Sequence, residues 1–322
     1  MNLEKINLRQ SRDFGETFNT SIKFLRQNFK PFFKSLLFIA GPFLLISSLA
    51  GAFYQSSAVK MYSTSMRVDY TSNVLEQFGW AYLFLILTAI IANLVLVGTV
   101  YSFIVNYMEK GPGEFTVNDV ANTLIKNIGN ILTVFFCITL LSILIICIVV
   151  GIAIAIGGTI PILGVLLGIG LFFGLLIIFP PLIWQLSVVY LVKMHSDLGP
   201  FAAFGKTREV MRDNYWWTWV IVVCSSIGIG IIGLVFALPQ GIFQAIMMFS
   251  NISGGGTSEG VSIAFLIVAT ICTFCTTLLY SLLYVINGVH YFSLAEKKDG
   301  LGLMDRINEI GNTPDSNVKQ QY

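Results

Sequence analysis

The sequence predicts an all-α integral membrane protein whose six transmembrane helices form three hairpins, each preceded by a cytoplasmic amphipathic surface helix. Three observations support this fold class. Hydrophobic residues make up 55% and charged residues 11% of the 322 positions, whereas about 25% charged residues is usual in soluble domains. Long uncharged runs recur along the chain, and amphipathic segments precede them. The Lys and Arg residues gather in stretches that would lie on one side of a membrane.

A surface helix is predicted within residues 1–31, which do not resemble a cleaved signal peptide because the apolar run begins only at Phe32. Asp13 and Glu16 have capping-box spacing, which favours a helix start. Apolar side chains then recur every three or four positions beside a basic stripe, as expected for a helix on an anionic lipid surface. The residues predicted to contact the membrane surface are Phe14, Phe18, Ile22, Lys23, Arg26 and Lys30.

The first hairpin is predicted over about 32–107. Its first helix covers about Phe32 to Tyr54, and its second covers about Trp80 to Tyr107. Gly41-Pro42 lies near the middle of the first helix and predicts a kink there. Gly111-Pro112-Gly113 predicts a turn after the second helix.

The middle hairpin, over about 131–192, occupies the longest uncharged run of the chain. No Asp, Glu, Lys or Arg lies between Lys126 and Lys193, and since a transmembrane helix needs about 20 apolar residues, the run is long enough for two. Gly157-Gly158-Thr159-Ile160-Pro161 predicts a tight turn between them. An amphipathic stripe precedes this hairpin, where Thr116 and Asp119 again have capping-box spacing. The stripe consists of Val117, Val120, Leu124 and Ile128.

The last hairpin is predicted over about 216–292, after a third amphipathic segment at 201–215. This segment matches the first one in letters, with Met211-Arg212-Asp213-Asn214-Tyr215 against Leu25-Arg26-Gln27-Asn28-Phe29. A unit of surface helix plus membrane hairpin is therefore predicted to occur three times. Residues 1–311 form one polytopic membrane domain in this interpretation, and 312–322 are expected to be a disordered cytoplasmic tail.

The distribution of positive charge predicts the orientation in the membrane. If the N-terminus is cytoplasmic, all of the 19 Lys and Arg residues except Lys60 and Arg67 lie on the cytoplasmic side. The positive-inside rule expects such a bias. The chain is thus predicted to be a multi-pass protein of a bacterial inner membrane, with both termini in the cytoplasm.

Few residues inside the predicted helices could carry chemistry. None of the 17 Asp and Glu residues falls in a predicted span, which argues against a carboxylate-coupled transporter. Asn93 and Gln185 could line a polar path, or they could hold helices together through hydrogen bonds. Pro180 and Pro181 have no backbone N–H, so the carbonyls of Leu176 and Ile177 lack their helical donors and could line a site. Alternatively, the two prolines only kink the helix.

Cofactors and nucleic acid are not expected. The five cysteines lie in apolar runs and are predicted to pack as small apolar side chains. His195 and His290 lack the spacing of a metal or haem site. The net charge of +2, with no basic patch among aromatics, does not suit nucleic acid. The expected partners are membrane lipids, anionic at the cytoplasmic face, and other membrane proteins.

Two stretches carry a resemblance, together with the three-hairpin pattern. These are Phe14-Gly15-Glu16 through Asn28-Phe29, and Tyr291-Phe292-Ser293-Leu294-Ala295-Glu296 to Ile310. The chain resembles uncharacterised bacterial polytopic membrane proteins and, more loosely, the membrane domain attached to glycerophosphodiester phosphodiesterases. In the fused proteins the catalytic domain is a separate soluble barrel, which this sequence lacks. The resemblance therefore implies a membrane module without catalytic residues.

The first functional hypothesis is a non-enzymatic inner-membrane protein that acts as a scaffold or as a subunit of an envelope assembly. It depends on the absence of a catalytic constellation and on the surface helices. The alternative is binding or passage of a small or lipid-like molecule through the bundle, not coupled through an intramembrane carboxylate. This alternative depends on Pro180, Pro181, Asn93 and Gln185. An intramembrane enzyme ranks third, because no nucleophile and base pair is recognisable.

Overall fold

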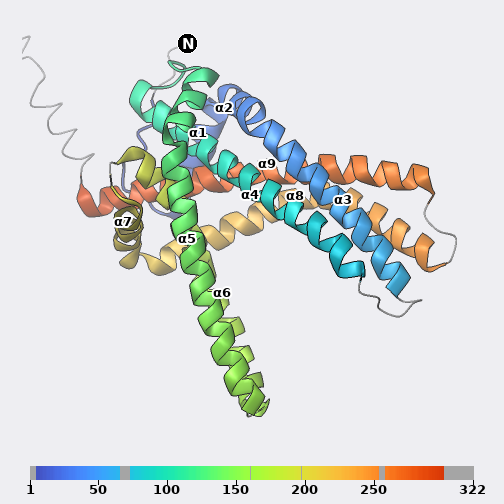
Figure 1. The fold of residues 1–322 in the computed structure, drawn as a ribbon. Coiled ribbons are helices and arrows are strands. Elements are labelled where there is room, and N and C mark those ends of the chain that lie inside the picture. Colours follow the sequence, from blue (N-terminus) through green and yellow to red (C-terminus); the bar gives the residue numbers. More distant parts are fainter. Residues whose placement is uncertain (1–4, 66–72, 160, 197, 254–257, 301–322) are drawn as a thin grey trace, which may run out of the picture.

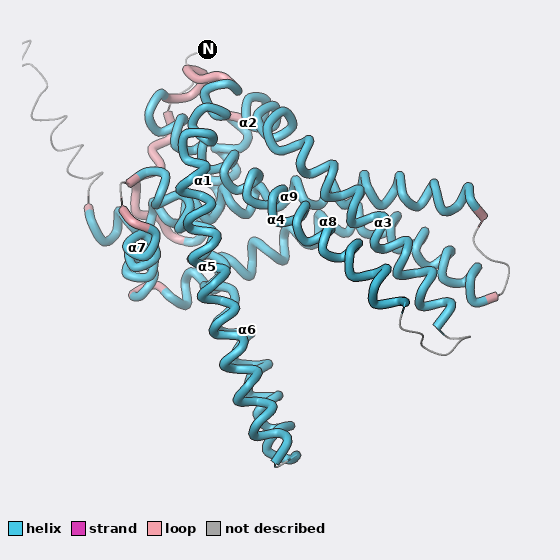
Figure 2. Tube along the Cα trace, in the orientation of Figure 1, coloured by secondary structure: helices cyan, strands magenta, loops and turns pink. Residues whose placement is uncertain are grey.

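The computed structural model describes residues 5–65, 73–159, 161–196, 198–253 and 258–300 (Figure 1). In these ranges the chain is helical and contains no β-strand (Figure 2). Six of its helical stretches are long and apolar enough to cross a membrane, which confirms the all-α, multi-pass class. They are Phe29–Val59, Gly79–Lys110, Val117–Leu140, Leu176–His195, Tyr215–Ser250 and Glu259–Asp299. The predicted tail, 312–322, lies outside the described residues.

The first of the predicted surface segments forms α1 (Phe14–Gln27), and its start is fixed by the predicted capping box. The Glu16 N–H donates to Asp13 Oδ1 at 2.7 Å, and the Asp13 N–H donates to Glu16 Oε2 at 3.2 Å. Asn28 ends the helix, because both its backbone N–H and its side-chain Nδ2 donate to the Phe24 carbonyl. The chain then continues as α2 (Phe29–Ser35).

The first span contains a π-helical turn, η1 (Leu36–Ala40), between α2 and α3 (Gly41–Ser65). The Gly41 N–H donates to the Leu36 carbonyl, five residues back. Pro42 follows at once and has no N–H to donate. The additional residue in the preceding turn accommodates the proline, so the irregularity occurs where the Gly41-Pro42 pair predicts one.

The chain next forms α4 (Asn73–Lys110) and α5 (Val117–Thr159), joined by the predicted turn. Gly111 and Gly113 have φ of 92° and 79°, a region that glycine adopts without strain. The structure differs from the expectation of a separate surface helix before the middle hairpin, because α5 is continuous through that segment. Neither a proline nor a positive-φ residue interrupts it, and its asparagine amides hydrogen-bond within the helix.

The rest of the described chain forms four helices. They are α6 (Pro161–His195), α7 (Pro200–Arg212), α8 (Tyr215–Ile252) and α9 (Glu259–Asp299). Gly199 and Pro200 start α7, which suits a proline because the first helical N–H has no intrahelical partner. Gly300 ends α9 in the left-handed conformation, with φ 63°.

Neighbouring helices pack in pairs, α3 with α4, α5 with α6, and α8 with α9. The pair α3/α4 also packs against α8/α9, whereas the α5/α6 pair points away in another direction (Figure 1). The main core lies where α1, α4, α6 and α9 meet. Its largest fully buried side chains include Trp184, Tyr101, Tyr107, Phe24 and Phe103. This junction fixes α6 relative to the helices around it.

Candidate functional site

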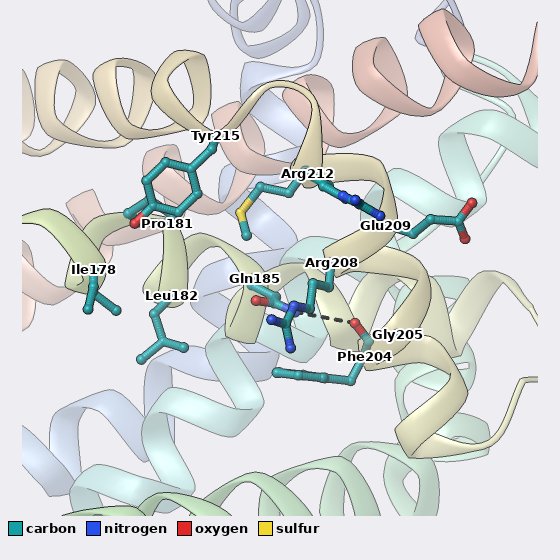
Figure 3. A pocket seen from close by; sticks show the side chains of 11 residues that line it. Ile178, Pro181, Leu182, Gln185, Phe204, Gly205, Arg208, Glu209, Arg212 and Tyr215 are labelled. Atoms are coloured by element: carbon teal, nitrogen blue, oxygen red, sulfur yellow. Dashed lines mark hydrogen bonds between the residues drawn. The ribbon is translucent and has the colours of Figure 1, made fainter. Parts of the chain in front are cut away.

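A cavity of about 860 Å³ lies between the second half of α6, the helix α7 and the first residue of α8 (Figure 3). We call it the α6–α7 groove. Ile178, Pro181 and Leu182 supply an apolar wall from α6. Arg208 and Arg212 line it from α7, on the other side of the hollow. The groove therefore combines an apolar surface with two guanidinium groups.

The two prolines of α6 fix one side of this groove through α8. Because Pro180 and Pro181 have no N–H, the carbonyls of Leu176 and Ile177 lose their helical donors. Two α8 side chains replace them. The Tyr215 hydroxyl donates to the Ile177 carbonyl at 3.0 Å, and Trp219 Nε1 donates to the Leu176 carbonyl at 3.2 Å.

Each predicted freed carbonyl therefore accepts a hydrogen bond within the protein, and these bonds fasten α8 to α6. The sequence shows which carbonyls are freed, but it does not show which side chains reach them. Tyr215 and Trp219 lie about 40 residues further along the chain, so only the tertiary arrangement reveals their role.

Gln185 fastens α7 to α6. Its side chain is 4% exposed, and its Nε2 donates to the Phe204 carbonyl at 3.2 Å (dashed line in Figure 3). Among the predicted polar-path residues, Pro181 and Gln185 line the groove, and Pro180 adjoins them in α6. Asn93 does not line it. Its Nδ2 instead donates to the Tyr284 hydroxyl of α9 at 3.3 Å, because it lies on the side of α4 that meets α9.

The charge balance of the groove is set by ion pairs on its outer side. Glu209 also lines the cavity, but its carboxylate is held by Lys298 at 3.1 Å. Lys206 pairs with Asp299 at 3.0 Å. In the part of the chain that the structure describes, no carboxylate lies within ion-pair distance of Arg208 or Arg212. The sequence analysis did not single out either arginine for this site.

A second hollow, of about 670 Å³, adjoins the groove because Arg212 and Tyr215 line both. It is more polar. Lys297 lines it, and its Nζ donates to Asn214 Oδ1 at 3.1 Å. Asp213 lies on the same hollow, as do two tryptophans, one of which, Trp216, is 64% exposed. Tryptophan is enriched at the level of lipid headgroups, where its ring is apolar and its N–H is hydrated.

The predicted membrane-surface residues lie on α1, except Lys30, which lies on α2. Thr17, Ser21 and Phe24 form the buried face of this helix, whereas Ile22 is 51% exposed. Lys23, Arg26 and Lys30 are exposed too, and Phe14 and Phe18 are half-buried with their ring centroids 4.8 Å apart. The predicted stripe is therefore exposed at Ile22 and partly covered at Phe14, whose ring centroid lies 5.9 Å from that of Trp217 in α8.

The two histidines each contact one polar side chain. His290 is 1% exposed, and its Nε2 lies 3.1 Å from the Thr218 hydroxyl. His195 Nε2 lies 2.7 Å from a guanidinium nitrogen of Arg9. Across the described ranges, no group of three His, Cys, Asp or Glu side chains is placed to hold a metal ion.

Comparison of the chain with family models, with curated proteins and with solved structures finds no match. The fold therefore defines a class, that of multi-pass helical membrane proteins, and the α6–α7 groove is the basis for a functional proposal.

Proposed function

We propose that the chain is a non-enzymatic membrane protein that binds a lipid-like molecule in the α6–α7 groove. The arrangement of the groove carries this proposal. Its α6 side is apolar at Ile178 and Leu182, and its α7 side presents Arg208 and Arg212. An amphiphile has the same division between tail and headgroup, and binding pockets commonly combine an apolar lining with a few polar groups that orient the ligand.

The position of the apolar wall supports a ligand that comes from the bilayer. Ile178, Pro181 and Leu182 belong to Leu176–His195, one of the six stretches that are long and apolar enough to cross a membrane. A lipid beside this stretch could therefore place an acyl chain against the wall.

A bulky substitution in the apolar wall tests this function. Leu182→Trp should fill the groove and reduce the lipid that remains with the purified protein several-fold, measured by native mass spectrometry in mild detergent. Phe179→Trp is the matched control, because Phe179 is exposed on the same helix but does not line the groove. Equal lipid retention by both variants and the unmodified chain would contradict the proposal.

We further infer an orientation with both termini in the cytoplasm of a bacterial cell and three hairpins in the inner membrane, each preceded by a surface segment. The distribution of Lys and Arg supports this orientation. In two of the three units the helix is interrupted between the surface segment and the span, and this shared feature supports the repeat. The interruption lies at Asn28 in the first unit and at Asp213–Asn214 in the last.

A second candidate function is that of a scaffold or a subunit of an envelope assembly. Hydrogen bonds between the segment 5–13 and the ends of α4 and α9 favour it. Lys5 Nζ donates to the Met108 carbonyl at 2.6 Å, the Ile6 N–H to the Tyr107 hydroxyl at 2.8 Å, and the Arg12 N–H to Ser293 Oγ at 2.8 Å. This segment and α1 form a layer fixed to the spans, which is a suitable surface for a partner.

The scaffold function is tested by replacing exposed residues of that layer. Asn19 and Lys23 are exposed on α1, and cysteines there should crosslink to a defined partner in intact membranes. A cysteine at Ser57, exposed in α3 at the other end of the first span, is the control. The scaffold proposal fails if all three positions give the same products.

A further inference from the structure

We propose that the ligand of the α6–α7 groove is a phospholipid with a net negative charge, whose phosphate is bound by Arg208 and Arg212. This inference rests on the proposed function, since it specifies the headgroup of the molecule that the groove holds. It adds a chemical class of ligand and two residues that recognise it.

The two arginines line the same cavity from α7. They are four residues apart, so they lie on the same face of that helix. In Figure 3 the Arg208 side chain extends toward Gln185 and the Arg212 side chain extends toward Glu209. The guanidinium group is planar and presents several N–H donors in a fork that matches phosphate oxygens. A phosphate in the cavity can accept from both groups when the long Arg212 side chain turns toward Arg208.

The other charged groups around the groove favour an anion. Glu209 is engaged by Lys298, whose Nζ also donates to the Glu209 carbonyl at 3.0 Å. The adjoining hollow contains Lys297 and Asp213. Because Glu209 is paired with Lys298, three lining cations remain, Arg208, Arg212 and Lys297. The remaining carboxylate is that of Asp213. A headgroup that ends in an ammonium would enter this positive surrounding unfavourably.

The groups beyond the phosphate suit a hydroxylated headgroup. Asn214 and Asp213 line the second hollow next to Arg212, and their oxygens can accept hydrogen bonds from hydroxyl groups. The apolar wall at Ile178, Pro181 and Leu182 has no function toward a free phosphate ion, because these side chains have no hydrogen-bond donor. The apolar wall and the two arginines together fit a lipid better than a free phosphate ion.

Binding of two lipids to the full-length protein in neutral detergent tests this inference. The probes are phosphatidylglycerol and phosphatidylcholine with the same acyl chains, titrated separately and followed by native mass spectrometry. We expect the unmodified protein to prefer phosphatidylglycerol. Each of Arg208→Gln and Arg212→Gln should weaken the binding of phosphatidylglycerol about tenfold, because each removes charge-assisted hydrogen bonds to the phosphate. Phosphatidylcholine has the same phosphate and should also bind more weakly to both variants.

Lys126→Gln is the control. Lys126 is an exposed cation on α5 and lines neither hollow. Its replacement should leave the affinity for phosphatidylglycerol unchanged. Size-exclusion profiles and melting temperatures equal to those of the unmodified protein establish that the variants are folded.

The outcomes separate this inference from the function on which it rests. If Leu182→Trp removes both lipids while Arg208→Gln and Arg212→Gln bind phosphatidylglycerol as tightly as the unmodified protein, the groove binds lipid and the phosphate assignment is wrong. If Leu182→Trp leaves both lipids bound, the proposed function itself fails. If glycerol phosphate or inorganic phosphate displaces phosphatidylglycerol completely at equal concentration, the site is one for free phosphate and the lipid assignment is overturned.

Discussion

Removal of the Tyr215 hydroxyl should weaken the attachment of α8 to α6, and the size of the effect should depend on Pro181. In the unmodified protein the hydroxyl donates to the Ile177 carbonyl at 3.0 Å, which has no helical donor because Pro181 lacks an N–H. Hydrogen bonds between membrane helices contribute on average about 0.6 kcal/mol, up to about 1.7 kcal/mol. Tyr215→Phe should therefore lower the free energy of unfolding by about 0.6–1.7 kcal/mol.

The dependence on Pro181 is the sharper part of this prediction. Pro181→Ala restores a helical N–H that can donate to the Ile177 carbonyl, so Tyr215→Phe should cost less in that background. A double-mutant cycle should give a coupling of about 0.5–1 kcal/mol. Unfolding would be followed by steric trapping in bicelles. A Tyr215→Phe effect of the same size with and without Pro181 would refute the argument that the proline creates the need for this bond.

Three other outcomes follow from the structure. In intact cells, an impermeant thiol reagent should label a cysteine at Ser57 but not one at Gly205; the reverse pattern would invert the proposed orientation. Ile22→Asp places a charge on the exposed face of α1 and should cost several kcal/mol if that face meets acyl chains, seen as loss of protein from the membrane fraction; a normal level would place that face in water. Gly98→Val should destabilise the protein by about 1–3 kcal/mol, since a Cβ there would meet leucine and isoleucine side chains of α5. Gly129 has open space around it, so the Gly129→Val protein is the control and should melt at nearly the original temperature.

The parts of the fold that the sequence predicts are those that depend on neighbouring residues. The capping box of Asp13 and Glu16 and the glycine turn at Gly111 are set by residues a few positions apart. The six long apolar helices follow from the length of the uncharged runs. The extent of α5 was not predicted, because an amphipathic stripe such as Val120 and Leu124 is compatible both with a separate surface helix and with the first turns of a long one.

The site could be predicted only in part, because its decisive contacts join distant segments. Pro180-Pro181 predicts that two carbonyls lack donors, and this follows from covalent structure alone. That Tyr215 and Trp219 supply those donors depends on how α8 crosses α6. The placement of Arg208 likewise depends on α7, which the Gln185 amide holds at the Phe204 carbonyl.

The packing of α1 explains why hydrophobicity alone does not distinguish the inner from the outer face in such a protein. Ile22 of α1 is exposed, whereas the buried face of this helix carries the small polar side chains Thr17 and Ser21 beside Phe24. Lipid is as apolar as a protein interior, so helices gain little by burying large apolar side chains against one another. Small side chains are favoured at helix contacts, since they allow close approach. The same reasoning applies to the α6–α7 groove. Its apolar wall can remain open beside the bilayer without an energetic penalty, and the arginines opposite are the part of it that requires a ligand of a particular charge.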